Sequence, residues 1–204
     1  MRRARVAVLV SGGGTNLQAL IDAAARGEMP HAELALVVSN VKDAYALTRA
    51  EKAGLPTVTL SKRALGGQEA FEAALTEALE AAAIDLIVLA GFMTILSGAF
   101  TARYDHRILN IHPSLIPSFC GEGFYGLRVH EAALRKGVKV TGATVHFVNE
   151  IPDGGEIILQ KAVNIRENDT PETLQKRVMR LAEWKLLPRA VEKISTELVM
   201  RNEE

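Results

Sequence analysis

The chain has 204 residues, 48% hydrophobic and 24% charged, which is enough for one sizeable core and too little for two ordinary domains. Lysine plus arginine and aspartate plus glutamate both number 24, and this balance disfavours nucleic acid and anionic membranes as partners. The single cysteine, Cys120, cannot form an intrachain disulfide, and no apolar run is long enough for a membrane span. The apolar run after the basic N-terminus is too short for a secretory signal. We therefore expect one cytoplasmic domain over residues 1–204.

Apolar runs in the first part of the chain predict strands, and several are apolar on both faces, as in the centre of a parallel sheet. The predicted strands are residues 6–10, 34–38, 57–60, 86–90 and 108–111. Apolar residues at helical spacing lie between them, as at Leu17, Leu20 and Ala24 and along residues 68–83. This βαβα order predicts an α/β fold with a mostly parallel sheet and helices on its faces.

The pattern changes in the last third of the chain. Residues 143–148 alternate between apolar and polar, residues 151–155 read as a turn, and residues 156–163 read as another strand. No helix fits between these strands, so we expect a C-terminal antiparallel extension. A long final helix should begin with Thr170 as N-cap and Pro171 at its first position, and Pro188 should kink or divide it.

The first loop, SGGGTNLQ at residues 11–18, follows a predicted strand and opens a predicted helix. Glycines let the backbone approach an anion, and the free N–H groups of a helix start point toward it. Thr15 and Gln18 have the spacing of a capping box. No P-loop lysine follows the glycines, and the dinucleotide pattern fails at Leu17. The residues alone leave two interpretations open, a site for a small phosphorylated ligand or a tight turn.

Polar chemistry follows the fifth predicted strand in NIHPSLIP, residues 110–117, where prolines restrict the backbone after Asn110 and His112. A second candidate is Asp153, in the turn of the antiparallel extension. Taken singly, His112 reads as an ordinary core histidine and Asp153 as a turn aspartate. Together they suggest a carboxylate that favours a charged imidazolium, hence a general acid. His146 lies on a strand face and is expected behind the site, in a supporting position.

Five motifs together resemble the glycinamide ribonucleotide formyltransferases, folate-dependent formyltransferases of purine biosynthesis, nearly from end to end. They are SGGGTN, AGFMTILS at residues 90–97, NIHPSLIP, VTGATVHFV at residues 140–148 and the DGG that begins at Asp153. The resemblance implies a Rossmann-like sheet, 10-formyltetrahydrofolate as co-substrate and no metal. It also implies that the amine of 5-phosphoribosylglycinamide attacks the formyl carbon directly, through a tetrahedral intermediate.

The family's site residues transfer to positions of this sequence that match its motifs. The catalytic residues would be Asn110, His112 and Asp153. The acceptor would be bound by Gly14, Thr15, Asn16 and, through its ribose, Glu183, and the folate by Met93, Thr94, Ile95, Leu96 and Asn110. The N-terminal half would thus bind phosphate, while the C-terminal half would bind folate and carry the catalytic residues.

In the expected mechanism, Asn110 donates to the oxyanion, and His112, held cationic by Asp153, donates a second hydrogen bond and supplies or relays a proton. The sequence departs from the family in two places. Gln68 stands where many relatives have a basic residue near the folate tail, and residues 118–129 form either a substrate lid or a longer surface loop. Nothing around Cys120 marks a nucleophile.

Three alternatives remain: a methionyl-tRNA formyltransferase, a hydrolase that passes the formyl group to water, and a non-catalytic sensor of a phosphorylated metabolite. The first needs a basic extension and the second typically has a regulatory domain, and we expect neither in this chain. For a sensor, the constellation of Asn110, His112 and Asp153 would have no purpose. A homodimer is one option for the oligomeric state, which the sequence leaves open. A cis peptide bond is expected at Ile116–Pro117, in the turn after the catalytic strand, because members of the family have one there.

Overall fold

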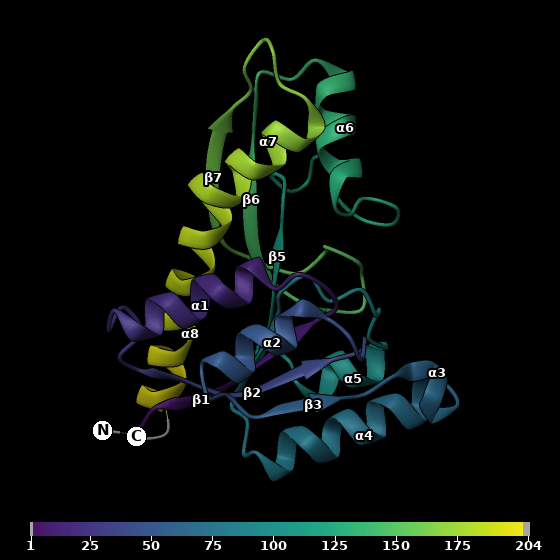
Figure 1. Ribbon diagram of the computed structural model, residues 1–204, viewed down its shortest axis with the longest axis vertical. Coiled ribbons are helices and arrows are strands. Elements are labelled where there is room, and N and C mark those ends of the chain that lie inside the picture. The colour runs from purple at the N-terminus through teal and green to yellow at the C-terminus, as the bar shows by residue number, and fades with distance from the viewer. Residues whose placement is uncertain (1, 202–204) are drawn as a thin grey trace.

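The computed structural model describes residues 2–201 and contains a seven-stranded sheet in the order β3-β2-β1-β4-β5-β6-β7 (Figure 1). The strands are β1 (Ala4–Val10), β2 (Ala32–Ser39), β3 (Thr57–Thr59), β4 (Leu86–Leu89), β5 (Ile108–His112), β6 (Val140–Phe147) and β7 (Ile157–Asn164). Strands β1 to β5 pair in parallel, and β5–β6 and β6–β7 pair antiparallel. The predicted parallel sheet with a C-terminal antiparallel extension is therefore confirmed.

Helices cover both faces of this sheet. They are α1 (Thr15–Ala25), α2 (Tyr45–Lys52), α3 (Lys62–Leu65), α4 (Gln68–Ala81), α5 (Gly98–Arg103), α6 (Leu127–Lys136), α7 (Pro171–Val178) and α8 (Trp184–Arg201). A π-helical turn, Met179–Glu183, joins α7 to α8. In Figure 1 the long α8 lies beside α1 against the body of the sheet, while α6 and α7 lie at the far end, with β6 and β7.

Strand β1 shows why the sheet is buried on both sides. Val6, Val8 and Val10 belong to one apolar cluster, with residues of α1, α2, α7 and α8. Ala7 and Leu9 belong to the other, with residues of α4 and α5. Each fully buried valine or leucine side chain contributes roughly 1.5–3 kcal/mol to folding. The sequence of β1 is apolar without alternation because both faces of the strand are buried.

Helix α1 begins differently from the sequence-based expectation. Its N-cap is Gly14, in the left-handed conformation at φ 70°, and no side chain caps the helix. The expected capping box of Thr15 and Gln18 is therefore wrong, because the glycine turn already places Thr15 in the helix. A Cβ at Gly14 would lie 2.6 Å from the Cβ of Ala46 on α2, so the close approach of this helix also requires glycine.

The final helical segment begins as predicted: Thr170 is the N-cap, Pro171 follows it, and Thr173 completes a capping box. The sequence predicted that Pro188 would kink or divide this helix. Instead α8 runs through Pro188 to Arg201, and the irregular turn is Met179–Glu183. A proline ring clashes with the carbonyl four residues before it, here that of Trp184, so its distortion acts toward the N-terminal side.

Two features after β5 and β6 shape the site. The Ile116–Pro117 peptide bond is cis, as expected. In the turn after β6, a Cβ at Gly155 would lie 1.8 Å from the carbonyl oxygen of Phe147, so only glycine fits. None of the helices among residues 2–201 has the length and apolarity that crossing a membrane requires.

Candidate active site

A cavity of about 660 Å³ opens at the carboxyl ends of the parallel strands. The glycine loop follows β1, the segment from Gly91 to Ile95 follows β4, and Asn110 and His112 end β5. Strand order reverses between β1 and β4, and ligands of open α/β sheets bind at such a switch point. The cavity is lined by residues from both halves of the chain, including Asn16, Asn110, His112, Asp153 and Glu183.

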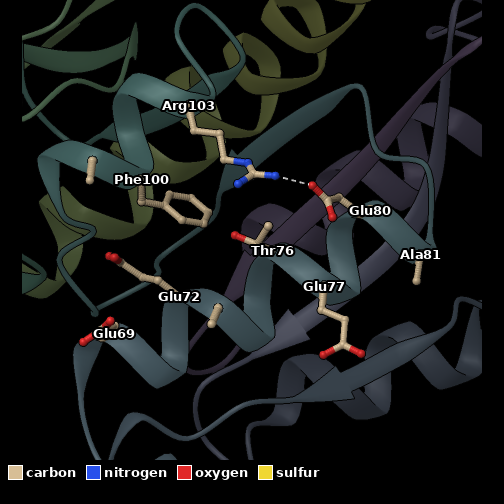
Figure 2. Close-up of a pocket in the computed structure, with 10 residues that line it drawn as sticks. Glu69, Glu72, Thr76, Glu77, Glu80, Ala81, Phe100 and Arg103 are labelled. Atoms are coloured by element: carbon tan, nitrogen blue, oxygen red, sulfur yellow. Dashed lines mark hydrogen bonds and ion pairs between the residues drawn. The ribbon is translucent and has the colours of Figure 1, made fainter.

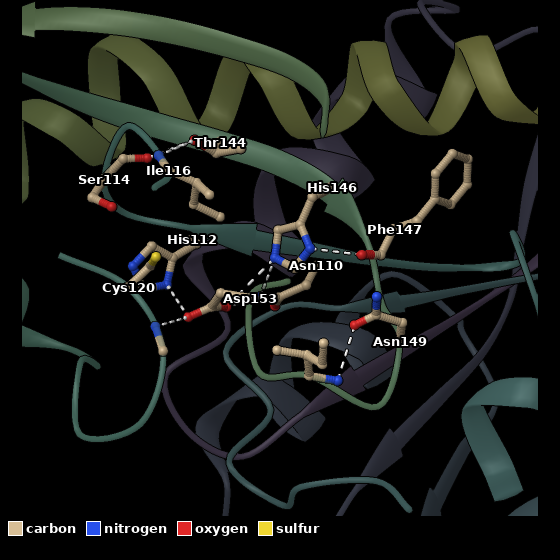
Figure 3. A network of polar contacts seen from close by, with 12 residues as sticks. Asn110, His112, Ser114, Ile116, Cys120, Thr144, His146, Phe147, Asn149 and Asp153 are labelled. Carbon is tan, nitrogen blue, oxygen red and sulfur yellow. Dashed lines mark hydrogen bonds and ion pairs between the residues drawn. The ribbon is translucent and has the colours of Figure 1, made fainter. Parts of the chain in front are cut away.

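Asp153 forms the centre of a polar network that the sequence predicted only in part (Figure 3). One carboxylate oxygen lies 3.3 Å from Nδ1 of His112, and the other lies 3.5 Å from Nε2 of His146. Nδ2 of Asn110 lies 3.4 Å from Asp153 Oδ1 and 3.2 Å from His146 Nε2. The structure therefore brings Asn110, His112 and Asp153 together, with His146 in direct contact with two of them.

Strand pairing explains this arrangement. Asn110 faces His146 and His112 faces Thr144 across the β5–β6 ladder. Nδ1 of His146 lies 2.7 Å from its neighbour's carbonyl oxygen, at Phe147, and donates a hydrogen bond to it. In the neutral ring Nε2 then accepts a hydrogen bond from the Asn110 amide, which fixes the direction in which that amide faces. His146 thus orients Asn110 when its ring is neutral, and Nε2 donates to Asp153 when the ring is protonated.

Opposing effects determine the pKa values of the pair. Burial lowers the pKa of His112 from its ordinary value; the Asp153 carboxylate and the Phe119 carbonyl oppose this without reversing it. Burial raises the pKa of Asp153, but the His146 ring, the charge on His112 and the Gly121 N–H together outweigh it and leave this pKa lowered. The net direction runs against the expectation that Asp153 holds His112 cationic, because desolvation of the ring exceeds the attraction of the carboxylate.

The loop after the cis proline is part of the site. Nε2 of His112 donates to the Phe119 carbonyl at 2.9 Å, and the Gly121 N–H donates to Asp153 at 2.8 Å. Residues 121–126 line the cavity. This loop, expected to be either a substrate lid or a longer surface loop, forms part of the cavity wall beside His112 and Asp153. Burial and Asp153 raise the pKa of the Cys120 thiol, the wrong direction for a nucleophile.

The glycine loop and the last helical segment meet at the opposite wall. Nδ2 of Asn16 donates to the Glu183 carboxylate at 2.8 Å, and both side chains are buried. Burial raises the pKa of Glu183 to about 7, with the Asn16 bond acting against this shift. Thr15, at the first helical position, faces a neighbouring groove together with Arg49 and Arg180. The predicted acceptor-binding residues therefore occupy one region of the structure.

The segment after β4 has unusually exposed apolar side chains. Met93 is 56% exposed and Ile95 is 72% exposed, and Ile151, which lines a smaller cavity together with Ile95, is 59% exposed. Thr94 and Ile95 line both the main cavity and a smaller one that shares Asn110 and Asp153; Met93 lines the first and Leu96 the second. Gln68 donates to the Ile95 carbonyl at 3.0 Å. Gln68 is the position at which many relatives have a basic residue, so here an uncharged side chain contacts this segment.

A larger groove of about 710 Å³ lies between α4 and α5 (Figure 2). Its walls carry Glu69, Glu72, Glu77 and Glu80, with Arg103 paired to Glu80. This charge repels a phosphorylated ligand, and the groove contains no acid–base pair like that of His112 and Asp153. Among residues 2–201 there is no group of three or more His, Cys, Asp or Glu side chains placed to hold a metal ion.

Sequence reasoning missed two kinds of site residue. Phe119 and Gly121 contribute backbone atoms, which leave no mark in a side-chain pattern. His130 lines the cavity from α6 and is fully buried. Its signal was its position three residues before Ala133, on the apolar face of a helical pattern.

Comparison with known proteins gives a consistent result. Residues 4–191 match the formyl transferase family. The chain is 43% identical to the phosphoribosylglycinamide formyltransferase of Haemophilus influenzae over 184 residues, which covers 90% of this chain and 84% of that protein. It is 46% identical over 202 residues to the trifunctional purine biosynthetic protein adenosine-3 of Bos taurus, covering 99% of this chain but only 19% of that protein.

Solved structures share the fold. The crystal structure of glycinamide ribonucleotide transformylase 1 from Symbiobacterium toebii aligns with a TM-score of 0.89 at 42% identity, covering 96% of this chain and 89% of that one. Phosphoribosylglycinamide formyltransferase from Brucella melitensis aligns with a TM-score of 0.86 at 43% identity, covering 95% and 96%.

Proposed function

The chain belongs to the formyl transferase family, and we propose that it transfers the formyl group of 10-formyltetrahydrofolate to the amine of 5-phosphoribosylglycinamide. The observation that carries this proposal is the cavity in which Asn110, His112 and Asp153 meet Asn16, which directly follows the glycine loop and Thr15. A phosphate-binding loop and an acid–base pair in one cavity suit a phosphorylated acceptor whose amine reacts. The step belongs to purine biosynthesis, as the names of the relatives state for those proteins.

The position of His112 in the cavity beside Asp153, together with its lowered pKa, supports the role of a proton relay. In the neutral tautomer that keeps its proton on Nδ1 toward Asp153, Nε2 of the imidazole accepts a proton from the attacking amine, and Asp153 stabilises the imidazolium that forms. The same proton then passes to the nitrogen that leaves the formyl carbon. For Nε2 to reach the substrate, the Phe119 carbonyl must give up its hydrogen bond, so the loop around Cys120 moves during the cycle.

Asn110 stabilises the tetrahedral oxyanion. One N–H of its amide bonds to His146, and the other faces Asp153 across a long contact of 3.4 Å. We assign this second N–H to the oxyanion, because a short bond to a developing negative charge is stronger than the long contact it replaces. His146 keeps the amide nitrogen, rather than its oxygen, on the side of the reaction.

The donor fits the segment after β4. A flat heteroaromatic ring would cover the exposed apolar side chains of Met93 and Ile95, and burial of such surface is favourable. The backbone of Thr94 and the side chain of Leu96 complete this part of the wall. When bound, this co-substrate supplies the formyl group. The residues of the chain position it and exclude water.

The acceptor fits the opposite wall. The amides of Gly14, Thr15 and Asn16 face its phosphate at the start of α1, and Glu183 accepts a hydrogen bond from its ribose. Arg180 shares the groove of Thr15 and adds positive charge beside the phosphate. This places the amine toward Asn110 and His112 at the other end of the cavity.

The test is turnover of 10-formyltetrahydrofolate, followed by the absorbance of the deformylated folate, with three acceptors in parallel. We expect turnover only with phosphoribosylglycinamide and none with methionyl-tRNA or water alone. Turnover without any acceptor would favour the hydrolase, and binding of phosphoribosylglycinamide without turnover would favour a sensor.

A further inference from the structure

His130 is a buried polar residue that the proposed mechanism does not use. It lies on α6 with an exposed fraction of 0%, and it lines the same cavity as His112. Within residues 2–201 neither of its ring nitrogens has a hydrogen-bond partner. A buried donor or acceptor left unpaired costs roughly 1–3 kcal/mol. The unpaired ring therefore lowers the stability of the fold. Its place in the cavity wall indicates that a polar group of a ligand is its partner.

The chemistry of the ring limits what that group is. Burial and then the charge on His112 lower the pKa of His130 to about 4. The ring is neutral near pH 7, so one nitrogen donates and the other accepts. A neutral imidazole matches an uncharged polar group and adds no charge for a phosphate. His130 lines the same cavity as Asn110 and His112, the residues assigned to the reaction.

We propose that His130 binds the amide of the acceptor's glycinamide portion and thereby positions the attacking amine. This inference rests on the proposed function, and it deepens it. The glycinamide links the ribose, assigned to Glu183, to the amine, assigned to Asn110 and His112. Its amide has one donor and one acceptor, and one nitrogen of the neutral His130 imidazole, in the wall of the cavity that these residues also line, can bond to either of them.

The test compares His130→Leu with His130→Gln, using calorimetric binding of phosphoribosylglycinamide, binding of the folate donor and the melting temperature. Leucine removes both unpaired nitrogens, so the melting temperature should not fall. Acceptor affinity should fall by about tenfold or more, with donor affinity unchanged within about twofold. Glutamine, which keeps a donor and an acceptor, should recover most of the loss. Ser195→Ala removes another buried hydroxyl without a partner in the described chain, outside the cavity, and should leave acceptor affinity unchanged.

Unchanged acceptor affinity in His130→Leu, or an equal loss for both substrates with a lower melting temperature, overturns the inference. Failure of the unmodified protein to bind phosphoribosylglycinamide overturns the proposed function instead. If His130→Leu does not fold, ¹⁵N spectra of histidine-labelled protein decide: saturating acceptor should shift a His130 ring nitrogen, and an unmoved signal overturns the inference.

Discussion

At His112, burial and the Asp153 carboxylate act on the pKa in opposite directions. Asp153→Asn removes the effect that raises this pKa, so the rising limb of activity with pH should move to lower pH while turnover at pH 7 falls. His112→Ala should lose roughly a hundredfold or more in kcat. Since both residues act through one imidazole, the double variant should lose far less than the product of the two single losses. A pH–rate series on the three variants checks this, and strictly multiplicative losses would mean that the relay is absent.

Glu183 gives a stability prediction at the same scale. Its folded-state pKa of about 7 lies above the ordinary 4.5. A carboxyl with a raised pKa contributes stability that is fully present below the unfolded pKa and is lost as the pH rises through the folded one. Glu183→Gln should therefore be more stable than the unmodified protein by about 2–3 kcal/mol at pH 8 and within about 1 kcal/mol at pH 5. Urea unfolding at both pH values measures this, and a difference independent of pH would contradict it.

The candidate site residues were predictable where a strand or a turn presents a polar side chain, as for Asn110 and His112 on β5 and Asp153 in the turn between β6 and β7. The direction in which the pKa of His112 shifts was not predictable, because it depends on how deeply the loop around Phe119 buries the ring. The direct contacts of His146 were also unpredictable, since they follow from the antiparallel register of β5 and β6.

At the scale of elements, the glycine loop has two glycines with contrasting surroundings. A Cβ at Gly14 would meet Ala46 and would sit at φ 70°, whereas nothing lies within 4 Å of a Cβ at Gly12. Gly14→Ala should therefore destabilise the fold by about 2–4 kcal/mol, from overpacking and the left-handed backbone. Gly12→Ala is the matched control and should stay within about 1 kcal/mol. Chemical denaturation separates the two, and equal effects would show that α2 does not approach the loop closely.

The groove beside the start of α1 leads to a binding prediction. Arg180 shares this groove with Thr15, while Arg189 lies on α8 outside it. Arg180→Gln should raise the KM for phosphoribosylglycinamide about tenfold and leave that for the donor unchanged, because a charge-assisted bond to phosphate is lost. Arg189→Gln should change neither. Initial rates at varied acceptor decide, and equal KM values in the two variants would remove Arg180 from the phosphate site.

Helices and strands were predictable where the hydrophobic periodicity or an apolar run points to a single type of element, as for β1, β4 and α4. The π-helical turn was not predictable. Its added residue shifts the apolar face of the helix, and the resulting spacing in the sequence looks the same as that of a regular helix with a shifted face. The start of α1 was misread because Thr15 and Gln18 satisfy a capping pattern that the left-handed Gly14 makes unnecessary.

For the whole molecule, alternation of strands and helices was enough to predict the sheet, its antiparallel extension and helices on both faces. That the N-terminal loop and Glu183 would line one cavity with Asp153 depends on how α8 packs against α1, which local patterns do not encode. Residues of the two halves therefore line one cavity.

Transfer of a ¹³C-labelled formyl group tests the central claim most directly. Labelled 10-formyltetrahydrofolate is mixed with phosphoribosylglycinamide and the protein, and the label is followed by NMR. The account predicts that the label moves to the glycinamide nitrogen, without free formate, and that His112→Ala slows this roughly a hundredfold or more. Label released as formate, or label that stays on the folate in a folded and acceptor-binding protein, would contradict it.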